Sequence, residues 1–214
     1  MMISNDLRCE LTSEELTSIL LRRLENFFII KEDEKQLILE KHNEVLLMIK
    51  DCFSAVENKY FKKDGATYFD YCHSGQYLIY LYFFSRIFAD IKHSLKDKFY
   101  YLNKIMHGVD IYSEVMLPKV FFFEHPLGLV LGRATYGENF FAMQGCTVGG
   151  NKGHYPTIGN NVKMFSDSKI LGKCKIGNNV WLSANSYVKD MDIPNNMIVF
   201  GQSPNLVLKE NKKI

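Results

Sequence analysis

Apolar residues follow two different periods along this chain of 214 residues, and the change falls near residue 105. Before that point they recur every three to four residues, which is the spacing of helices that bury one face. The pattern predicts helices from the Thr12–Glu15 capping box to about Leu24, and over residues 34–53, 74–89 and 95–106. Residues 1–105 are therefore expected to form an α-helical domain.

After residue 105 the apolar positions repeat every six residues, which matches neither a helix nor a simple alternating strand. The clearest run of aliphatic or Met positions is Ile158, Met164, Ile170, Ile176, Leu182 and Val188. The same rhythm extends upstream through Val130, Tyr136, Ala142 and Val148, and a longer gap before Ile158 marks an inserted loop. The repeat predicts a solenoid in which three hexapeptides close a coil of roughly 18 residues around an apolar interior. Gly-Asn-Asn at 159–161 and 177–179 suits tight corners, because Gly and Asn tolerate left-handed backbone.

Composition excludes several classes of protein. The net charge of +2 and the 47% of hydrophobic residues are typical of a globular protein and give no indication of a nucleic-acid partner. The five cysteines are widely spaced, so neither a disulfide framework nor a metal site is expected. The longest apolar run, Tyr77 to Phe84, is too short to cross a membrane, and no secretory segment follows the start of the chain. A cytoplasmic location is expected.

Short motifs between His107 and Leu208 occur in a fixed order. They are Gly108–Ile111, Phe122–His125, Thr147–Gly150, His154–Gly159, Lys169–Gly172 and Val199–Pro204. In this order they resemble the serine O-acetyltransferase branch of the hexapeptide-repeat acyltransferases. The resemblance implies a left-handed parallel β-helix over residues 106–208, followed by a flexible tail over 209–214. With the helical domain at 1–105, the predicted fold class is α+β.

The resemblance also implies a catalytic pair. His125 takes the place of the general base, which removes the proton from the acceptor hydroxyl as its oxygen attacks the acetyl thioester. Asp110 takes the place of the carboxylate that orients the imidazole. This chemistry is reasonable because an alcohol is a poor nucleophile until it is deprotonated, and imidazole titrates near neutral pH. Cys146 lies at an inward position of the repeat and is predicted to be inert core.

The residues that the resemblance places around the acceptor are Glu124, Lys152, His154 and Tyr155. Glu124 stands where the serine enzymes carry Asp, and His154-Tyr155 stands before Pro156 where they carry Arg-His. Both departures fall where the acceptor is recognised. The sequence therefore favours a sugar of a surface polysaccharide, or its precursor, as the acceptor, and an aromatic such as Tyr155 can stack on a sugar ring.

Acetyl-CoA is the implied co-substrate, lying between adjacent β-helices of a homotrimer that can pair into a dimer of trimers. The positions that match its contacts are Ser166, Ala184, Lys189, Gln202 and Pro204, although the family's Gly-Ala-Gly is Phe165–Asp167 here. Other functions remain possible on the sequence alone. Serine O-acetylation in cysteine synthesis is the first alternative, a non-catalytic hexapeptide scaffold is the second, and transfer to an amine is chemically similar.

Overall fold

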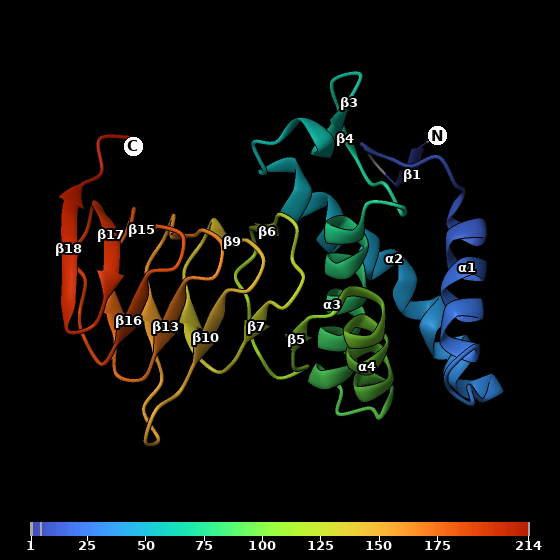
Figure 1. The fold of residues 1–214 in the computed structure, drawn as a ribbon. Coiled ribbons are helices and arrows are strands. Elements are labelled where there is room, and N and C mark those ends of the chain that lie inside the picture. The colour runs from blue at the N-terminus through green and yellow to red at the C-terminus, as the bar shows by residue number, and fades with distance from the viewer. Residues whose placement is uncertain (1, 5, 214) are drawn as a thin grey trace. The chain divides into compact units, whose positions relative to one another are not determined.

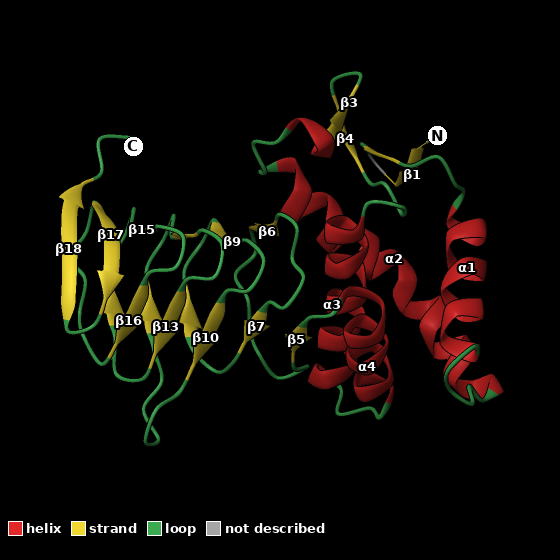
Figure 2. Ribbon diagram, in the orientation of Figure 1, coloured by secondary structure: helices red, strands yellow, loops and turns green. Residues whose placement is uncertain are grey.

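The computed structural model describes residues 2–4 and 6–213 and divides the chain into two compact units, Met1–Met106 and His107–Ile214. Figures 1 and 2 draw the first unit as helices with a small sheet, and the second as a stack of short strands. None of the helices formed by these residues has the length and apolar character that a membrane span requires.

The helices of the first unit agree with those predicted. They are α1 (Ser13–Glu25), α2 (Glu32–Ser54), α3 (Ser74–Asp90) and α4 (Leu95–His107), with a short 3-10 helix at Lys59–Phe61. Thr12 and Glu15 form both hydrogen bonds of the capping box, which sets the start of α1. A small sheet, ordered β1-β2-β4-β3, was not expected from the sequence because its strands are too short to display a period. Its strands are β1 (Met2–Ser4), β2 (Leu7–Arg8), β3 (Lys62–Lys63) and β4 (Ala66–Tyr68).

His42, on α2, is buried in the core of this unit and is only 2% exposed. Its Nδ1 lies 2.9 Å from Thr17 Oγ1, and the Thr17 hydroxyl donates its proton to Ser13 O. Nδ1 also lies 3.1 Å from Ser13 Oγ, so two hydroxyl groups surround this ring nitrogen. The ring stacks on Phe84, and Nε2 is buried without a hydrogen-bond partner among the described residues. Burial lowers the pKa of His42 to about 4, so the ring is neutral at neutral pH.

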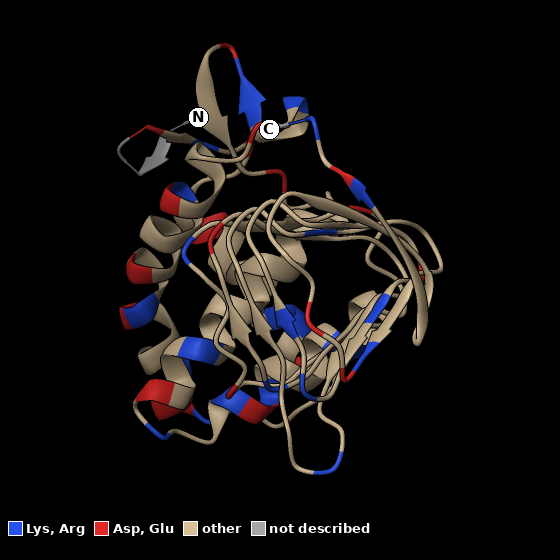
Figure 3. Cartoon of the chain, turned by 90° about the vertical axis from the view of Figure 1, so that its left-hand side faces the viewer, with Lys and Arg blue, Asp and Glu red and all other residues tan. Residues whose placement is uncertain are grey.

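The second unit is a parallel β-solenoid of about five coils with three faces, seen along its axis in Figure 3. The first face holds β5 (Asp110–Ile111), β7 (Val130–Leu131), β10 (Thr147–Gly149), β13 (Lys169–Leu171) and β16 (Tyr187–Lys189). The second holds β6 (Phe121–Phe123), β9 (Phe140–Ala142), β12 (Lys163–Met164), β15 (Trp181–Leu182) and β17 (Met197–Gln202). The third holds β8 (Thr135–Tyr136), β11 (Thr157–Ile158) and β14 (Lys175–Ile176). An antiparallel strand, β18 (Asn205–Glu210), pairs with β17.

The six-residue repeat fills the interior of the solenoid, as predicted. Every position from Ile158 to Val188 in the repeat is at most 2% exposed. The upstream end differs, because Val130 is 39% exposed and Leu131 takes the inward place opposite Val148. The corner between Leu131 and Tyr136 is one residue shorter than the repeat, so the rhythm slips by one position there.

Asparagines stack at the corner between the third and second faces, where the sequence predicts tight turns. Asn161 and Asn179 have φ of 56° and 57°, in the left-handed region. Asn161 Nδ2 donates to Asn179 Oδ1 over 2.9 Å, and Asn179 Nδ2 donates to Asn196 Oδ1 over 2.8 Å. The coils approach so closely here that a Cβ added to Gly137 would lie 2.4 Å from the carbonyl carbon of Gly159.

The C-terminal segment is ordered further than the sequence predicts. Residues Lys209 and Glu210, assigned to a flexible tail, belong to β18 and pair with β17. Asn211 is 2% exposed, and its Nδ2 donates to Asn179 O over 3.1 Å. The hairpin supplies the backbone partners that a frayed tail would lack.

Candidate active site

His125 lies on a corner that is longer than the corners stacked next to it. Phe123 of β6 pairs with Ala142 of β9, and Gly128 and Gly145 occupy the matching turn positions beyond them. The segment from Phe123 to Gly128 is two residues longer than the segment from Ala142 to Gly145. His125 lies in this extra length and is exposed, with φ of 50°. Its backbone O accepts a 2.7 Å hydrogen bond from the Leu127 N–H.

Asp110 begins the strand that pairs with the segment leaving this corner. It lies opposite Val130, and its N–H donates to Leu129 O over 2.8 Å. One step earlier, Gly128 N–H donates to Gly108 O over 2.9 Å. Asp110 is half-buried in the coil that carries His125, so the register brings the two predicted catalytic residues to the same end of the solenoid. Their roles stay a prediction.

The corners that follow β9, β12 and β15 stack in line with the His125 corner. Asp167 N–H donates to Gln144 O, and Asn185 N–H donates to Ser166 O, each over 2.9 Å. Half-buried Ser166 and exposed Ala184 therefore lie on one edge of the solenoid, between the first and second faces. We call this the His125 edge.

The C-terminal hairpin continues the His125 edge. Gln202 pairs with Tyr187 at the end of β17, and the turn after it carries exposed Pro204. Lys189 N–H donates to Ser203 Oγ over 2.9 Å, which holds the end of β16 against this turn. The structure thus brings Ser166, Ala184, Gln202 and Pro204 to one edge or directly beside it. Lys189 lies instead at the loop end of β16, in register with Leu171 and Gly149.

Phe165 does not block this edge. Its ring packs between Phe141 and Trp181, with centroid distances of 6.0 and 5.8 Å. Those contacts hold the ring along the second face. The small side chains of Ser166 and Ala184 are left to define the edge, and this fits an extended ligand that lies along it.

Glu124 lies next to His125, and its half-buried position is fixed by an N–H that donates to Ala142 O over 3.2 Å. The other predicted acceptor residues belong to the loop at residues 150–156, which projects from the coils with a basic tip in Figure 3. Asn151 and His154 exchange two backbone hydrogen bonds of 2.9 Å, so the loop forms a small hairpin. Lys152, His154 and Tyr155 are exposed on it.

The base of the loop is tied to a later coil. Asn151 Nδ2 donates to Asp190 Oδ2 over 2.7 Å, and Lys173 N–H donates to Asp190 Oδ1 over 2.9 Å. The Lys173 backbone bond and the Asn151 bond lower the pKa of Asp190, so this carboxylate stays ionised. The loop leaves β10 at the edge between the first and third faces. Within one chain, the structure therefore does not bring Lys152, His154 and Tyr155 next to His125.

Arg133 is a further candidate residue, and it lies outside the motifs that mark the site in the sequence. Its guanidinium carbon lies 4.8 Å from the centre of the Tyr155 ring, in a cation–π contact. The two residues meet because Thr135 N–H donates to Pro156 O over 3.0 Å, which ties the loop end to the preceding coil. Nothing in the local sequence signals a contact across 22 positions.

Cys146 is buried, and its Sγ approaches Phe165 O at 3.2 Å. Burial raises the pKa of this thiol, as expected for the inert core residue that the repeat predicts. Within residues 2–4 and 6–213, no group of three or more His, Cys, Asp or Glu side chains is placed to hold a metal ion.

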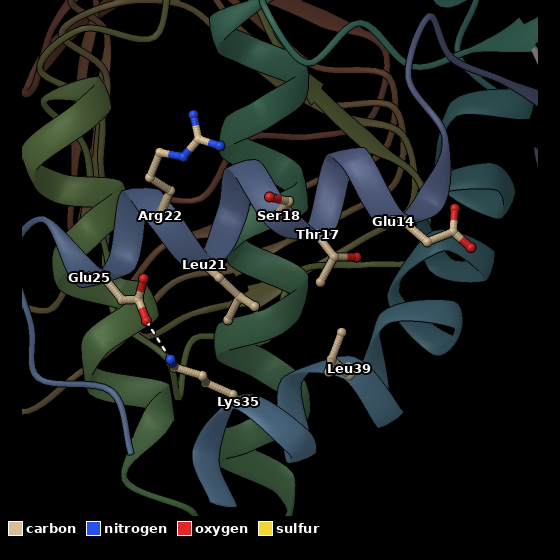
Figure 4. A pocket seen from close by; sticks show the side chains of 8 residues that line it. All are labelled: Glu14, Thr17, Ser18, Leu21, Arg22, Glu25, Lys35 and Leu39. Carbon is tan, nitrogen blue, oxygen red and sulfur yellow. Dashed lines mark ion pairs between the residues drawn. The ribbon is translucent and has the colours of Figure 1, made fainter. Parts of the chain in front are cut away.

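A groove of about 400 Å³ lies between α1 and α2 in the helical unit (Figure 4). Lys35 pairs with Glu25 across it at 2.8 Å, and this carboxylate raises the pKa of Lys35. The groove is lined by Glu14, Thr17, Ser18, Leu21, Arg22, Glu25, Lys35 and Leu39. None of the predicted site residues is among them.

No protein-family model matches the chain. Over 118 residues, the chain is 36% identical to a serine acetyltransferase of Staphylococcus epidermidis. The match covers 53% of this chain and 55% of that protein, so the chain spans about half the length of the curated relatives it matches.

Solved structures share the fold over most of the chain. The crystal structure of Neisseria gonorrhoeae serine acetyltransferase aligns with a TM-score of 0.69, covering 93% of this chain and 81% of its own, at 21% identity. A serine acetyltransferase in complex with CoA aligns with a TM-score of 0.70, covering 92% and 84%, at 19% identity. The predicted left-handed β-helix after a helical domain is confirmed. So is the resemblance to serine O-acetyltransferase-like hexapeptide-repeat acyltransferases.

Proposed function

We propose that this chain is an acetyl-CoA-dependent O-acetyltransferase whose acceptor is L-serine. The observation that carries the proposal is the lengthened corner that exposes His125 at the head of an edge running to the C-terminal hairpin. The sequence match to a serine acetyltransferase supports the acceptor. The motifs alone favour a polysaccharide sugar first and serine second, whereas the similarity to serine acetyltransferases supports serine over a sugar.

His125 acts as the general base in this proposal. Its imidazole takes the proton from the acceptor hydroxyl while the hydroxyl oxygen forms a bond to the thioester carbonyl carbon. The carbon–sulfur bond then breaks, and the imidazolium returns the proton to the departing thiolate. Asp110 orients the ring and stabilises its charged form, as a carboxylate on the second ring nitrogen does in other enzymes. The products are an O-acetyl ester and CoA.

Acetyl-CoA would lie along the His125 edge, against Ser166, Ala184, Gln202 and Pro204. Lys189, at the loop end of β16, lies away from this path. A solved relative with the same fold is in complex with CoA, which supports this cofactor. The edge supplies small and polar side chains, and the Phe165 ring packs away from it.

A homotrimer would complete the site. The loop with Lys152, His154 and Tyr155 lies on the opposite edge of the first face from His125, so a loop from a neighbouring copy is needed to reach the base. The second face presents partly exposed aromatic and aliphatic side chains to solvent, among them Trp181, Ile198 and Phe200. Such a face is a reasonable surface for self-association.

A sugar hydroxyl is the second candidate acceptor. The observation that favours it is the pair of departures at Glu124 and at His154-Tyr155, both at positions predicted to contact the acceptor. Exposed Tyr155 offers a ring face for stacking on a sugar.

The test is release of CoA from acetyl-CoA with L-serine, N-acetylneuraminic acid and neutral hexoses offered separately. Wild-type protein should turn over L-serine, and His125→Asn should lower kcat by roughly 10²- to 10⁴-fold, the usual contribution of a general base. Asn tolerates the left-handed backbone, so an unchanged unfolding midpoint serves as the control. Turnover of a sugar alone would select the second candidate. No CoA release with any hydroxyl would favour the non-catalytic scaffold.

A further inference from the structure

We propose that Arg133 binds a carboxylate of the acceptor, with the Tyr155 ring as the platform that holds its guanidinium in place. This inference rests on the proposed function and names its substrate class, a hydroxyl compound that carries a carboxylate. Four observations carry it: a rigid corner, a packed ring, a guanidinium without an acidic partner, and its distance from the cofactor edge.

The backbone around Arg133 is fixed on both sides. Gly132 N–H donates to Val148 O over 2.8 Å, and Tyr136 Oη donates to Gly132 O over 2.7 Å. Thr135 N–H donates to Pro156 O over 3.0 Å. Arg133 therefore projects from a corner that has little freedom to move, which is what a specificity residue requires.

The Tyr155 ring is packed from beneath. A Cβ added to Gly150 would lie 2.6 Å from Tyr155 Cε1, so the ring occupies the space that Gly150 leaves free. Tyr155 is still 43% exposed, and Arg133 covers part of its face. A cation–π contact uses no hydrogen-bond donor, so the five N–H groups of the guanidinium stay available.

The acidic groups of this region are already engaged elsewhere. Asp190 accepts from Asn151 and from the Lys173 N–H, and Glu138 accepts from the Lys119 and Val120 N–H groups. Within the part of the chain that the structure describes, Arg133 forms no ion pair or hydrogen bond through its side chain. Lys152 adds a second positive charge on the adjacent loop. The corner therefore carries positive charge that no acidic side chain among the described residues neutralises, and this favours binding of an anion.

A carboxylate suits this site better than a phosphate of the cofactor. A planar guanidinium binds either a carboxylate or a phosphate with two parallel hydrogen bonds, so the position of Arg133 decides between them. The residues proposed for the cofactor, Ser166, Ala184, Gln202 and Pro204, lie along or beside the His125 edge, at the other side of the first face from Arg133. In the proposed homotrimer, Arg133 and Tyr155 therefore serve the acceptor at the His125 edge of a neighbouring copy. The acceptor class that follows includes L-serine and sialic acids, and it excludes neutral hexoses.

The test is equilibrium binding by calorimetry to the 214-residue chain with saturating CoA. Two pairs of compounds differ only in the carboxylate: L-serine with L-serinamide, and N-acetylneuraminic acid with its methyl ester. The variants are Arg133→Gln and Lys173→Gln. Lys173 also follows a Gly at the end of a first-face strand, so its substitution removes the same charge from a matched position without touching Tyr155.

Wild-type protein should bind one carboxylate compound roughly 10- to 100-fold more tightly than its neutral partner, the range expected for hydrogen bonds to charged groups. Arg133→Gln should remove that preference and leave CoA affinity unchanged, while Lys173→Gln should keep it. Equal weakening of both members of a pair, or a loss of CoA affinity alone, would overturn the inference. So would the absence of any carboxylate preference in the wild type. Turnover, measured separately, decides the proposed function.

Discussion

The helical unit is expected to lose stability between pH 8 and pH 5, and replacing His42 by Asn is expected to make that loss smaller. The ring is buried and neutral, and burial lowers its pKa to about 4, against about 6.5 in an unfolded chain. The neutral ring therefore favours the folded state above pH 6.5. As the pH falls, the unfolded state takes up a proton first, and the contribution is fully lost below the folded pKa.

The magnitude follows from the two pKa values. Linkage between about 4 and about 6.5 gives a loss of about 2 kcal/mol from pH 8 to pH 5. The Glu14 carboxylate opposes this shift, but burial dominates it. Asn keeps an N–H donor for Thr17 and does not titrate. Its smaller side chain lowers stability at every pH, so the informative quantity is the difference between the two pH values.

Urea unfolding followed by the helical circular dichroism signal at pH 5 and pH 8 measures this difference. Wild-type protein and His154→Asn, which alters an exposed histidine of the loop, should both lose about 2 kcal/mol more than His42→Asn. Equal losses in all three proteins would refute the reasoning, because the pH dependence would then come from groups other than His42.

Two further predictions concern the stacked corners of the solenoid, and urea unfolding measures both. Gly137→Ala should cost more than about 2 kcal/mol, because its Cβ would lie 2.4 Å from the Gly159 backbone. Gly153→Ala, at a left-handed position with open space, should cost only about 1 kcal/mol; equal costs would contradict the packing argument. Asn179→Ala should cost about 2–3 kcal/mol, from two amide hydrogen bonds and the left-handed backbone. Asn179→Gly should cost about 1 kcal/mol less, and a Gly variant no more stable than the Ala variant would show that the backbone term is absent.

The interior of the solenoid could be predicted because each inward position demands the same kind of side chain. Met164 and Leu182 are two such positions, three hexapeptides apart, and both are fully buried. Val130 could not be placed, since both it and Leu131 are aliphatic and only strand pairing decides which points inward. The residue types alone do not reveal that the corner between Leu131 and Tyr136 is one residue short.

The site could be predicted only in part, because its features depend on which coils stack. The motif around His125 was visible, but the extra length of its corner appears only when Phe123 is paired with Ala142. The contact between Arg133 and Tyr155 joins two coils and has no local signature. The opposite placement of the loop and the base likewise follows from the three-faced shape and not from any residue type.

The stacking of the coils also fixes distances along the solenoid axis in multiples of the spacing between strands. Neighbouring strands lie about 4.8 Å apart, so the four steps from β6 to β17 separate the His125 corner from the C-terminal hairpin by roughly 19 Å. Deleting one residue within a strand would exchange inward and outward side chains, whereas deleting a whole coil would preserve every face. Evolution can therefore change the reach of this edge only in steps of one coil, each moving the base by about 5 Å relative to the far end.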